Sequence, residues 1–209
     1  MSADVIPFAT ALRPAETGRG FKSFKTSRAI PYTRRCCRDA LIQATLDPEV
    51  TGLLPYEGPL GAPDAFFTFG VQIADRNCLL ALCDETNGKT FPPPEEFSLG
   101  LTVNRESILS EPVLTTTRTV WSRREVLVPP LFSVRVLKRL AMEPAGIELG
   151  ALEDELVQEP SRWVDYVMAM ACSGLVTVDC RRPLTDATAI KSGRTRQQRQ
   201  RPSHHWLYR

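Results

Sequence analysis

The fold of this chain is decided by residues 32–85, which read YTRRCCRDALIQATLDPEV, then TGLLPYEGPLGAPDA, then FFTFGVQIADRNCLLALCDE. In the first part, a helix is predicted by the near-helical spacing of Cys36, Ala40, Ile42 or Gln43, and Leu46. Asp47-Pro48 ends this helix, because a proline ring clashes with the helical turn that precedes it.

The third part predicts a hairpin of two strands. From residue 67 to residue 73, apolar residues alternate with polar or small ones, as in a strand buried on one face. The second strand, CLLALC at residues 78–83, is continuously apolar, as expected of a strand covered on both faces. We expect the strands to face each other across Asp75-Arg76-Asn77. The helix, a short strand and this hairpin indicate half of a small α/β core.

Four segments in this order carry a resemblance to a known family: GFKSFKTSRAIPYTRRCCRD, LDPEV, FFTFGV and CLLALC. They resemble the N-terminal domain of TnsA-type transposon endonucleases, in the restriction-endonuclease-like PD-(D/E)XK superfamily. That family shows a basic approach segment, a helix carrying a glutamate, a "YPDF"-like strand and an "E-x-K" strand one hairpin later. In order of elements, the resemblance extends to about residue 190.

The residues that match the family's catalytic motif have lost its chemistry. The resemblance places the glutamate at Cys37, the metal-binding aspartate at Thr68, and the "E-x-K" pair at Ala81 and Cys83. Such nucleases hold Mg²⁺ with carboxylates, and the ion polarises the phosphate and activates water. A hydroxyl, a methyl group and two thiols do not replace hard oxygen ligands. The sequence therefore predicts a noncatalytic relative with no metal and no cofactor.

Acidic residues near the motif leave an alternative open. Asp39 follows Cys37 by two residues, and Asp84 and Glu85 come directly after the predicted buried strand. A relocated site on these acids would make the protein an active Mg²⁺-dependent DNA endonuclease. Acids at a turn or a strand end are, however, ordinary solvated groups.

Composition indicates a soluble globular protein. The 209 residues are 43% hydrophobic and 24% charged, enough for one full core or two small ones. Neither a long apolar run nor a signal segment is present, which predicts a cytoplasmic protein with no membrane partner. The six cysteines lack paired C-x₂-C spacing, so we expect reduced, buried thiols rather than a zinc site.

The net charge of +2 conceals a strong asymmetry. Residues 1–40 carry eight Lys and Arg against three acids, and residues 191–209 carry six and no acid. The rest of the chain is acidic, so we expect the two ends to hold a polyanion such as DNA. The candidate DNA-binding residues are Lys22, Lys25, Arg28, Arg34, Arg35, Arg162, Arg181, Arg182, Lys191, Arg194, Arg196, Arg199 and Arg201.

Beyond the hairpin, the pattern predicts a second unit. Three prolines before Glu95-Glu96 indicate the start of a short helix, and residues 112–128 are rich in β-branched residues, which predicts an outer strand. Pro129-Pro130 then forms a joint. Residues 131–142, 147–157 and 161–175 have helical spacing, and two short strands around Arg181-Arg182-Pro183 follow.

Three helices and a hairpin are the outline of a winged helix, which TnsA-type proteins also resemble in their C-terminal domain. We therefore expect an α/β (α+β) protein in four parts. These are a basic arm (1–30), a nuclease-like domain (31–128), a winged-helix-like domain (129–190) and a basic flexible tail (191–209). The leading hypothesis is a DNA-binding or assembly subunit of a mobile-element complex, with DNA and a transposase or similar protein as partners. A winged-helix transcriptional regulator is a further alternative, and the oligomeric state stays open.

Overall fold

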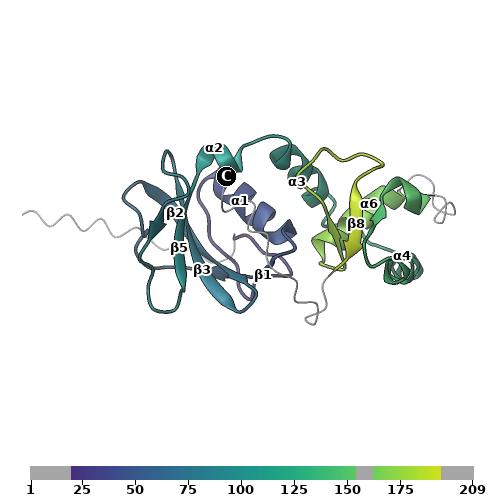
Figure 1. Ribbon diagram of the computed structural model, residues 1–209, viewed down its shortest axis with the longest axis horizontal. Coiled ribbons are helices and arrows are strands. Elements are labelled where there is room, and N and C mark those ends of the chain that lie inside the picture. Colours follow the sequence, from purple (N-terminus) through teal and green to yellow (C-terminus); the bar gives the residue numbers. More distant parts are fainter. Residues whose placement is uncertain (1–19, 154–161, 194–209) are drawn as a thin grey trace, which may run out of the picture.

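The computed structural model describes residues 20–153 and 162–193 of the chain. It is a mixed α+β structure with a five-stranded sheet at one end and helix α4 (Pro130–Met142) at the other (Figure 1). Helix α1 (Arg35–Leu46) lies against the sheet, and α3 (Val113–Trp121) lies between α1 and a second, smaller sheet (Figure 1).

The larger sheet has the order β1 (Val50–Pro55), β2 (Ala65–Ile73), β3 (Arg76–Cys83), β5 (Leu99–Asn104) and β4 (Thr90–Phe91). Strands β1, β2 and β3 form an antiparallel meander, β5 runs parallel to β3, and the short β4 pairs antiparallel with β5. The predicted helix and hairpin are therefore confirmed. The turn differs by register: Ile73 pairs with Arg76, so the turn is Ala74-Asp75, and Arg76 and Asn77 belong to β3.

Two faces of this sheet differ in what they bury. The α1 face carries Phe69, Val71, Leu80 and Leu82, which belong to the main hydrophobic core together with α1. The opposite face, here called the outer face, carries Ala81 and Cys83, which form a separate small cluster with Ala65. Period-2 alternation along each strand produces this division.

The helix expected at Glu95-Glu96 is absent. Residues 92–98 form turns that lead from β4 to β5, and Phe97 is buried there. The Phe97 ring lies 2.7 Å from the position that a Cβ on Gly70 would occupy, so the missing side chain makes room for it. The ring replaces a covering helix on this part of the outer face.

The outer strand predicted for residues 112–128 is also wrong, because its core is helix α3. A short helix α2 (Arg105–Ile108) precedes it. The hydroxyl of Thr117 donates to the Val113 carbonyl at 2.7 Å, and that of Thr119 donates to the Thr115 carbonyl at 2.8 Å. Bonds to the carbonyl four residues earlier let threonine fit in a helix. Burial of Leu114, Thr117, Val120 and Trp121 on one side overrides the β preference of the threonine run.

The C-terminal part begins with α4 at Pro130. Strand β6 (Ile147–Glu148) and a short 3₁₀ helix (Gly150–Leu152) occupy the first part of the helix predicted over residues 147–157, and residues 154–157 lie outside the described residues. Helix α6 (Trp163–Cys172) is closed by Gly174, which has a φ of 78°. The Leu175 N–H then donates to the Met170 carbonyl, as is usual where glycine ends a helix. Strands β7 (Val176–Val178) and β8 (Ala189–Ser192) then pair antiparallel, giving a sheet of order β6-β8-β7. The tail predicted from residue 191 thus begins within β8.

Residues 21–30, predicted to belong to a basic arm, are part of the folded body. Phe21 and Ile30 exchange backbone hydrogen bonds at 2.8 and 2.9 Å, and the Phe21 ring stacks on Trp121 with centroids 5.2 Å apart. The Leu53 N–H donates to the Lys25 carbonyl at 2.8 Å, which covers part of the β1 edge. One hydrophobic core runs from α1 through Trp121 to α4 and α6.

Within residues 20–153 and 162–193, no helix has the length and apolar character needed to cross a membrane. All six cysteines lie in this part and are free thiols; Cys180 is half-buried and the other five are buried.

Candidate functional site

The four positions that match the nuclease motif lie on two sides of the sheet. Thr68 and Ala81 are cross-strand partners, and Cys83 lies two residues beyond Ala81, so all three face the outer side. Cys37 lies on α1 and packs in the main core on the other side. The structure therefore does not bring Cys37 together with the other three.

At Thr68, Ala81 and Cys83 the outer face carries small neutral side chains, and the carboxyl group of Asp64 lies beside Cys83. The Thr68 hydroxyl donates to the Leu60 carbonyl at 2.9 Å, and Ala81 is fully buried. Phe91 of β4 packs against the cluster that contains Ala81 and Cys83. No carboxylate occupies any of the four motif positions.

The two thiols are held in their neutral form. Burial raises the pKa of Cys83 to about 12, with the neighbouring Asp64 acting in the same direction. Burial likewise raises the pKa of Cys37 to about 12. A neutral thiol is a poor metal ligand, and Mg²⁺ prefers oxygen. Among the described residues, no group of three or more His, Cys, Asp or Glu side chains could hold a metal ion.

Asp39 is buried and engaged in an ion pair. Arg118 of α3 donates from Nε to Oδ1 at 2.9 Å and from Nη2 to Oδ2 at 2.6 Å. The hydrogen bond to Asp39 raises the pKa of Arg118 above its ordinary value. This bidentate pair joins α1 to α3, so the carboxylate has a structural partner on the α1 side of the sheet.

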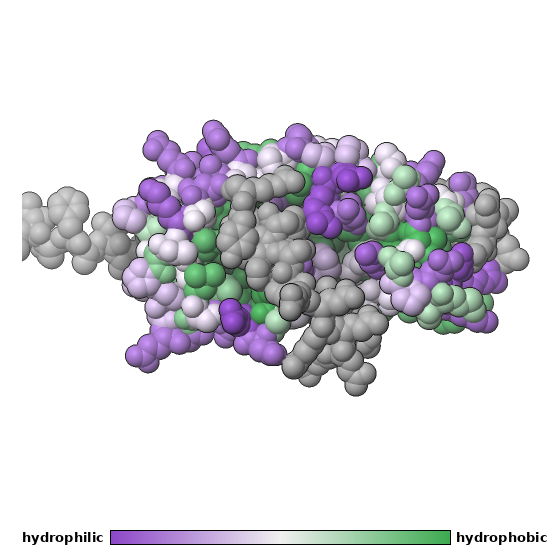
Figure 2. Space-filling view, in the orientation of Figure 1, coloured by the Kyte–Doolittle hydropathy of each residue, from purple (hydrophilic) through white to green (hydrophobic). Residues whose placement is uncertain are grey.

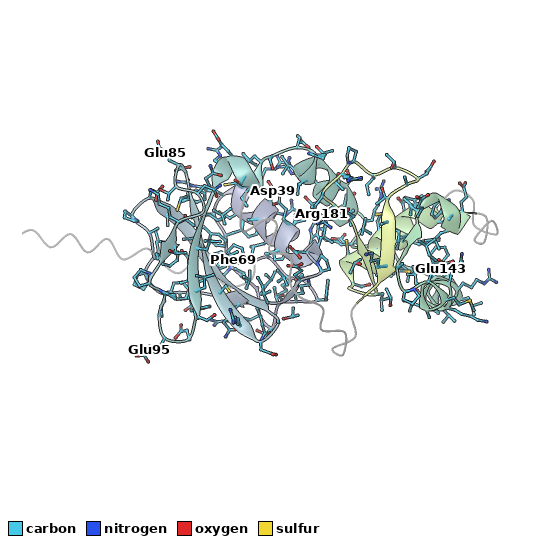
Figure 3. All side chains as sticks on the ribbon, viewed as in Figure 1. Asp39, Phe69, Glu85, Glu95, Glu143 and Arg181 are labelled. Atoms are coloured by element: carbon cyan, nitrogen blue, oxygen red, sulfur yellow. The ribbon has the colours of Figure 1, made fainter. Side chains whose placement is uncertain are left out.

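Asp84 and Glu85 lie elsewhere. Both are exposed at the end of β3, and Asp84 Oδ2 lies 3.5 Å from Nη1 of Arg34. Figure 3 shows Glu85 at the edge of the molecule beyond the sheet and Asp39 on helix α1, in the interior. The structure therefore does not bring together Asp39, Asp84 and Glu85, the acids of the alternative relocated site.

Sequence reasoning missed Asp64, which lies directly before β2. Its Oδ2 accepts a hydrogen bond from the Thr86 N–H at 3.1 Å, and hydrogen bonds from Thr86 lower its pKa. The signal was the dipeptide Pro63-Asp64, a literal match to the Pro-Asp of the family motif. Asp64 ties the start of β2 to the segment after β3.

Lys25, predicted to contact DNA, instead lies at the C-terminal end of α1. Its Nζ donates to the Asp47 carbonyl at 2.5 Å and to the Ala44 carbonyl at 3.4 Å. A cation there complements the negative end of the helix. Burial lowers the pKa of Lys25 to about 8, although the charge of Asp47 opposes the shift. The interaction joins residues far apart in sequence, so no local pattern could reveal it.

The other candidate cations of the first part lie on the surface. Lys22 and Arg35 are exposed. Arg28 lies 3.2 Å from Glu57, and Arg34 stacks its guanidinium 4.2 Å from the Phe66 ring centroid. The first turn of α1 contains no acidic residue, so Arg34 and Arg35 add positive charge to the positive end of this helix.

The C-terminal cations are divided between surface positions and residues outside the described part. Arg162, Arg182 and Lys191 are exposed, and Arg181 donates from Nε to Asp179 at 2.9 Å. The remaining candidates lie outside the described residues; they are Arg194, Arg196, Arg199 and Arg201.

Helix α6 corresponds to the third helix of the predicted winged helix. Most of its residues are buried, and its one acid, Asp165, lies 2.6 Å from Arg123. A helix buried on nearly all sides cannot enter a DNA groove.

No family model, no curated protein and no solved structure matches this chain.

Proposed function

We propose that this protein is a noncatalytic, TnsA-like subunit that binds DNA or helps assemble a transposition or other mobile-element complex. Its architecture would be a restriction-endonuclease-like domain followed by a winged-helix-like domain. One observation carries the proposal: Cys37, Thr68, Ala81 and Cys83 are buried side chains without a carboxylate. A helix, a strand and a hairpin follow one another in the expected order, and the four motif positions on them carry no metal-binding carboxylate.

The order of elements supports the domain assignment. Helix α1, strand β1 and the β2-β3 hairpin follow one another as the resemblance implies, and β5 then joins β3 in parallel. In the C-terminal part, α4 and α6 accompany a three-stranded antiparallel sheet that ends in the β7-β8 pair. The chain departs from the expected parent fold in lacking a helix between β3 and β5.

Both alternatives find less support. An active endonuclease with relocated acids would need Asp39 and Asp84 in one pocket, whereas Asp39 is paired with Arg118 and Asp84 with Arg34. A transcriptional regulator would need an accessible reading helix, and α6 is mostly buried.

DNA binding is assigned to the basic ends rather than to a reading helix. Lys25 is left out because its amino group donates to the end of α1. The exposed candidates in the N-terminal part of the chain are then Lys22, Arg28, Arg34 and Arg35. Residues 194–209 contribute five more arginines and no acid. Binding of this kind neutralises phosphates and is largely indifferent to base sequence.

A salt titration tests this assignment. The full chain is compared with a chain that ends at Gly193, on two unrelated duplexes. Ending at Ile190 would cut β8, whereas Gly193 still donates its N–H to the Leu175 carbonyl. We expect weaker binding to both duplexes. The slope of log K against log salt should become shallower by roughly 0.9 for each phosphate that the shortened chain no longer neutralises.

Two further variants sharpen the titration. Lys22→Gln with Arg35→Gln should make the slope shallower again, and Arg76→Gln, an exposed cation at the far hairpin, is the matched control and should leave it unchanged. A weakening confined to one duplex, or an unchanged slope in the shortened chain, would favour the regulator.

A further inference from the structure

Exposed apolar side chains gather on and just before α4. Leu127, Leu131, Val134 and Met142 are 91%, 74%, 62% and 66% exposed. The other exposed large hydrophobic residues of the described part are each at most 49% exposed. Single exposed apolar residues are common, but four on one helix and its approach form a patch.

These residues form a second stripe on α4. One side of the helix buries Phe132, Val136 and Leu140 in the core. Leu131, Val134, Lys138 and Met142 follow one another at spacings of three and four on the opposite side. An ordinary surface helix has a single apolar stripe. Here the second one, called the α4 stripe, faces away from the body.

The α4 stripe lies at one end of the molecule and carries positive charge. Figure 1 shows α4 at the end opposite the five-stranded sheet, and Figure 2 shows hydrophobic and hydrophilic atoms side by side there. Lys138 is exposed in the middle of the stripe, and none of the ion pairs found between described residues involves it. The helix has three cations and no acid before Glu143, which pairs with Arg139 at 2.9 Å.

We propose that the α4 stripe is a docking site for an acidic amphipathic helix of a partner protein. Apolar residues of that helix, spaced by three and four, pack on Leu131, Val134 and Met142, and a carboxylate pairs with Lys138. This deepens the assembly role proposed above and rests on it. The site is independent of the phosphate-binding cations, which lie on other elements.

Charge argues against a second copy of the chain as the occupant. In an antiparallel pair of α4 helices, Lys138 of each copy would face Val134 and Arg135 of the other. Lysine would then be buried against apolar and cationic groups, and α4 itself (residues 130–142) has no acid to pair with it. An acidic helix supplies both the apolar surface and the missing charge.

The test uses the full chain and two synthetic helical peptides of about 20 residues, long enough to form helix. Both carry leucine at spacings of three and four; the other positions are mainly glutamate in one and lysine in the other. We expect the acidic peptide to bind at least tenfold more tightly by fluorescence anisotropy, a difference of about 1.4 kcal/mol. Hydrogen exchange should slow over residues 130–142.

Variants separate the stripe from general stickiness. Leu131→Ser with Val134→Ser should weaken binding of the acidic peptide about tenfold, and Lys138→Glu should reverse the preference toward the basic peptide. Val164→Ser, which removes an exposed apolar residue on α6, is the matched control and should change nothing. None of these side chains belongs to the buried core, so circular dichroism should remain that of the parent.

Three results would overturn the proposal: equal affinity for both peptides, an unchanged preference in Lys138→Glu, or a dimer in sedimentation that Val134→Lys dissolves. The dimer would assign the stripe to a second copy. Failure here leaves the salt dependence of DNA binding untouched, so it can be told apart from failure of the proposed function.

Discussion

The two faces of the five-stranded sheet have very different contents. On the α1 face, Phe69, Leu80 and Leu82 belong to a core that continues through Trp121 into the C-terminal helices. On the outer face, Thr68, Ala81 and Cys83 are small and are covered by loops and by Phe91. The comparison teaches that stability is concentrated on the α1 face. The outer face, where the resemblance placed most of the catalytic motif, carries a thin layer of small side chains at those positions.

The largest expected effect contrasts neighbouring residues on the two faces. Phe69→Ala should lower the free energy of unfolding by about 3–5 kcal/mol, because it leaves a cavity in the main core. Thr68→Val keeps the shape and removes one hydrogen bond to Leu60, so it should cost about 1 kcal/mol. Urea unfolding of both variants measures the difference. Equal destabilisation would mean that the outer face is as stabilising as the α1 face.

Replacing either residue of the ion pair between Asp39 and Arg118 should destabilise the protein, but by different amounts. Arg118→Ala leaves the carboxylate of Asp39 buried without its partner and should cost about 3–5 kcal/mol. Asp39→Asn leaves Arg118, which is 37% exposed and can regain water, so about 1–3 kcal/mol is expected. The same unfolding experiment compares them. A larger destabilisation in Asp39→Asn would contradict the buried position of the carboxylate.

We expect Lys25 to make the free energy of unfolding depend on pH. Its pKa is lowered from 10.5 to about 8 in the folded protein, so folding disfavours its charged form. Between pH 8 and 10.5 the unfolded chain binds more protons at this group, and its contribution to stability therefore rises with pH. The difference in unfolding free energy between wild type and Lys25→Met should change by at most about 1.4 kcal/mol per pH unit in this range, in favour of wild type as the pH rises. A difference that stays constant would place Lys25 in water.

The smallest effect is expected at the surface ion pair between Arg28 and Glu57. Arg28 and Glu57 are both more than half exposed at 3.2 Å, so Arg28→Ala should change the unfolding free energy by less than about 0.5 kcal/mol. Thermal unfolding at low and high salt checks this. A destabilisation comparable with that of Arg118→Ala would show that this ion pair is held more firmly than the exposure of its two side chains indicates.

The sequence predicted the parts of the fold that depend on local periodicity. The helix before Asp47-Pro48, the hairpin around residue 75, α4 and α6 all follow patterns of apolar spacing. The threonine run was misread because β preference is weak against burial, and the threonine hydroxyls found acceptors within α3. The three prolines do not start a helix, because Phe97 already covers the sheet there.

The candidate site was harder to predict because its interactions join residues distant in the chain. Arg118 reaches Asp39 and Lys25 reaches Asp47 across intervening elements, and no local spacing indicates either pair. Matching the motif fixed residue types but left open which side of the sheet α1 covers, so Cys37 was grouped with three residues that lie across the sheet.

The central claim, that the protein has no nuclease chemistry, is tested most directly by nicking of supercoiled plasmid in Mg²⁺ or Mn²⁺. We expect no nicking by the purified full chain, at protein concentrations where it binds the same plasmid. Nicking that disappears in Asp84→Ala or Asp64→Ala, with circular dichroism unchanged, would contradict the claim and establish a relocated metal site at the end of β3.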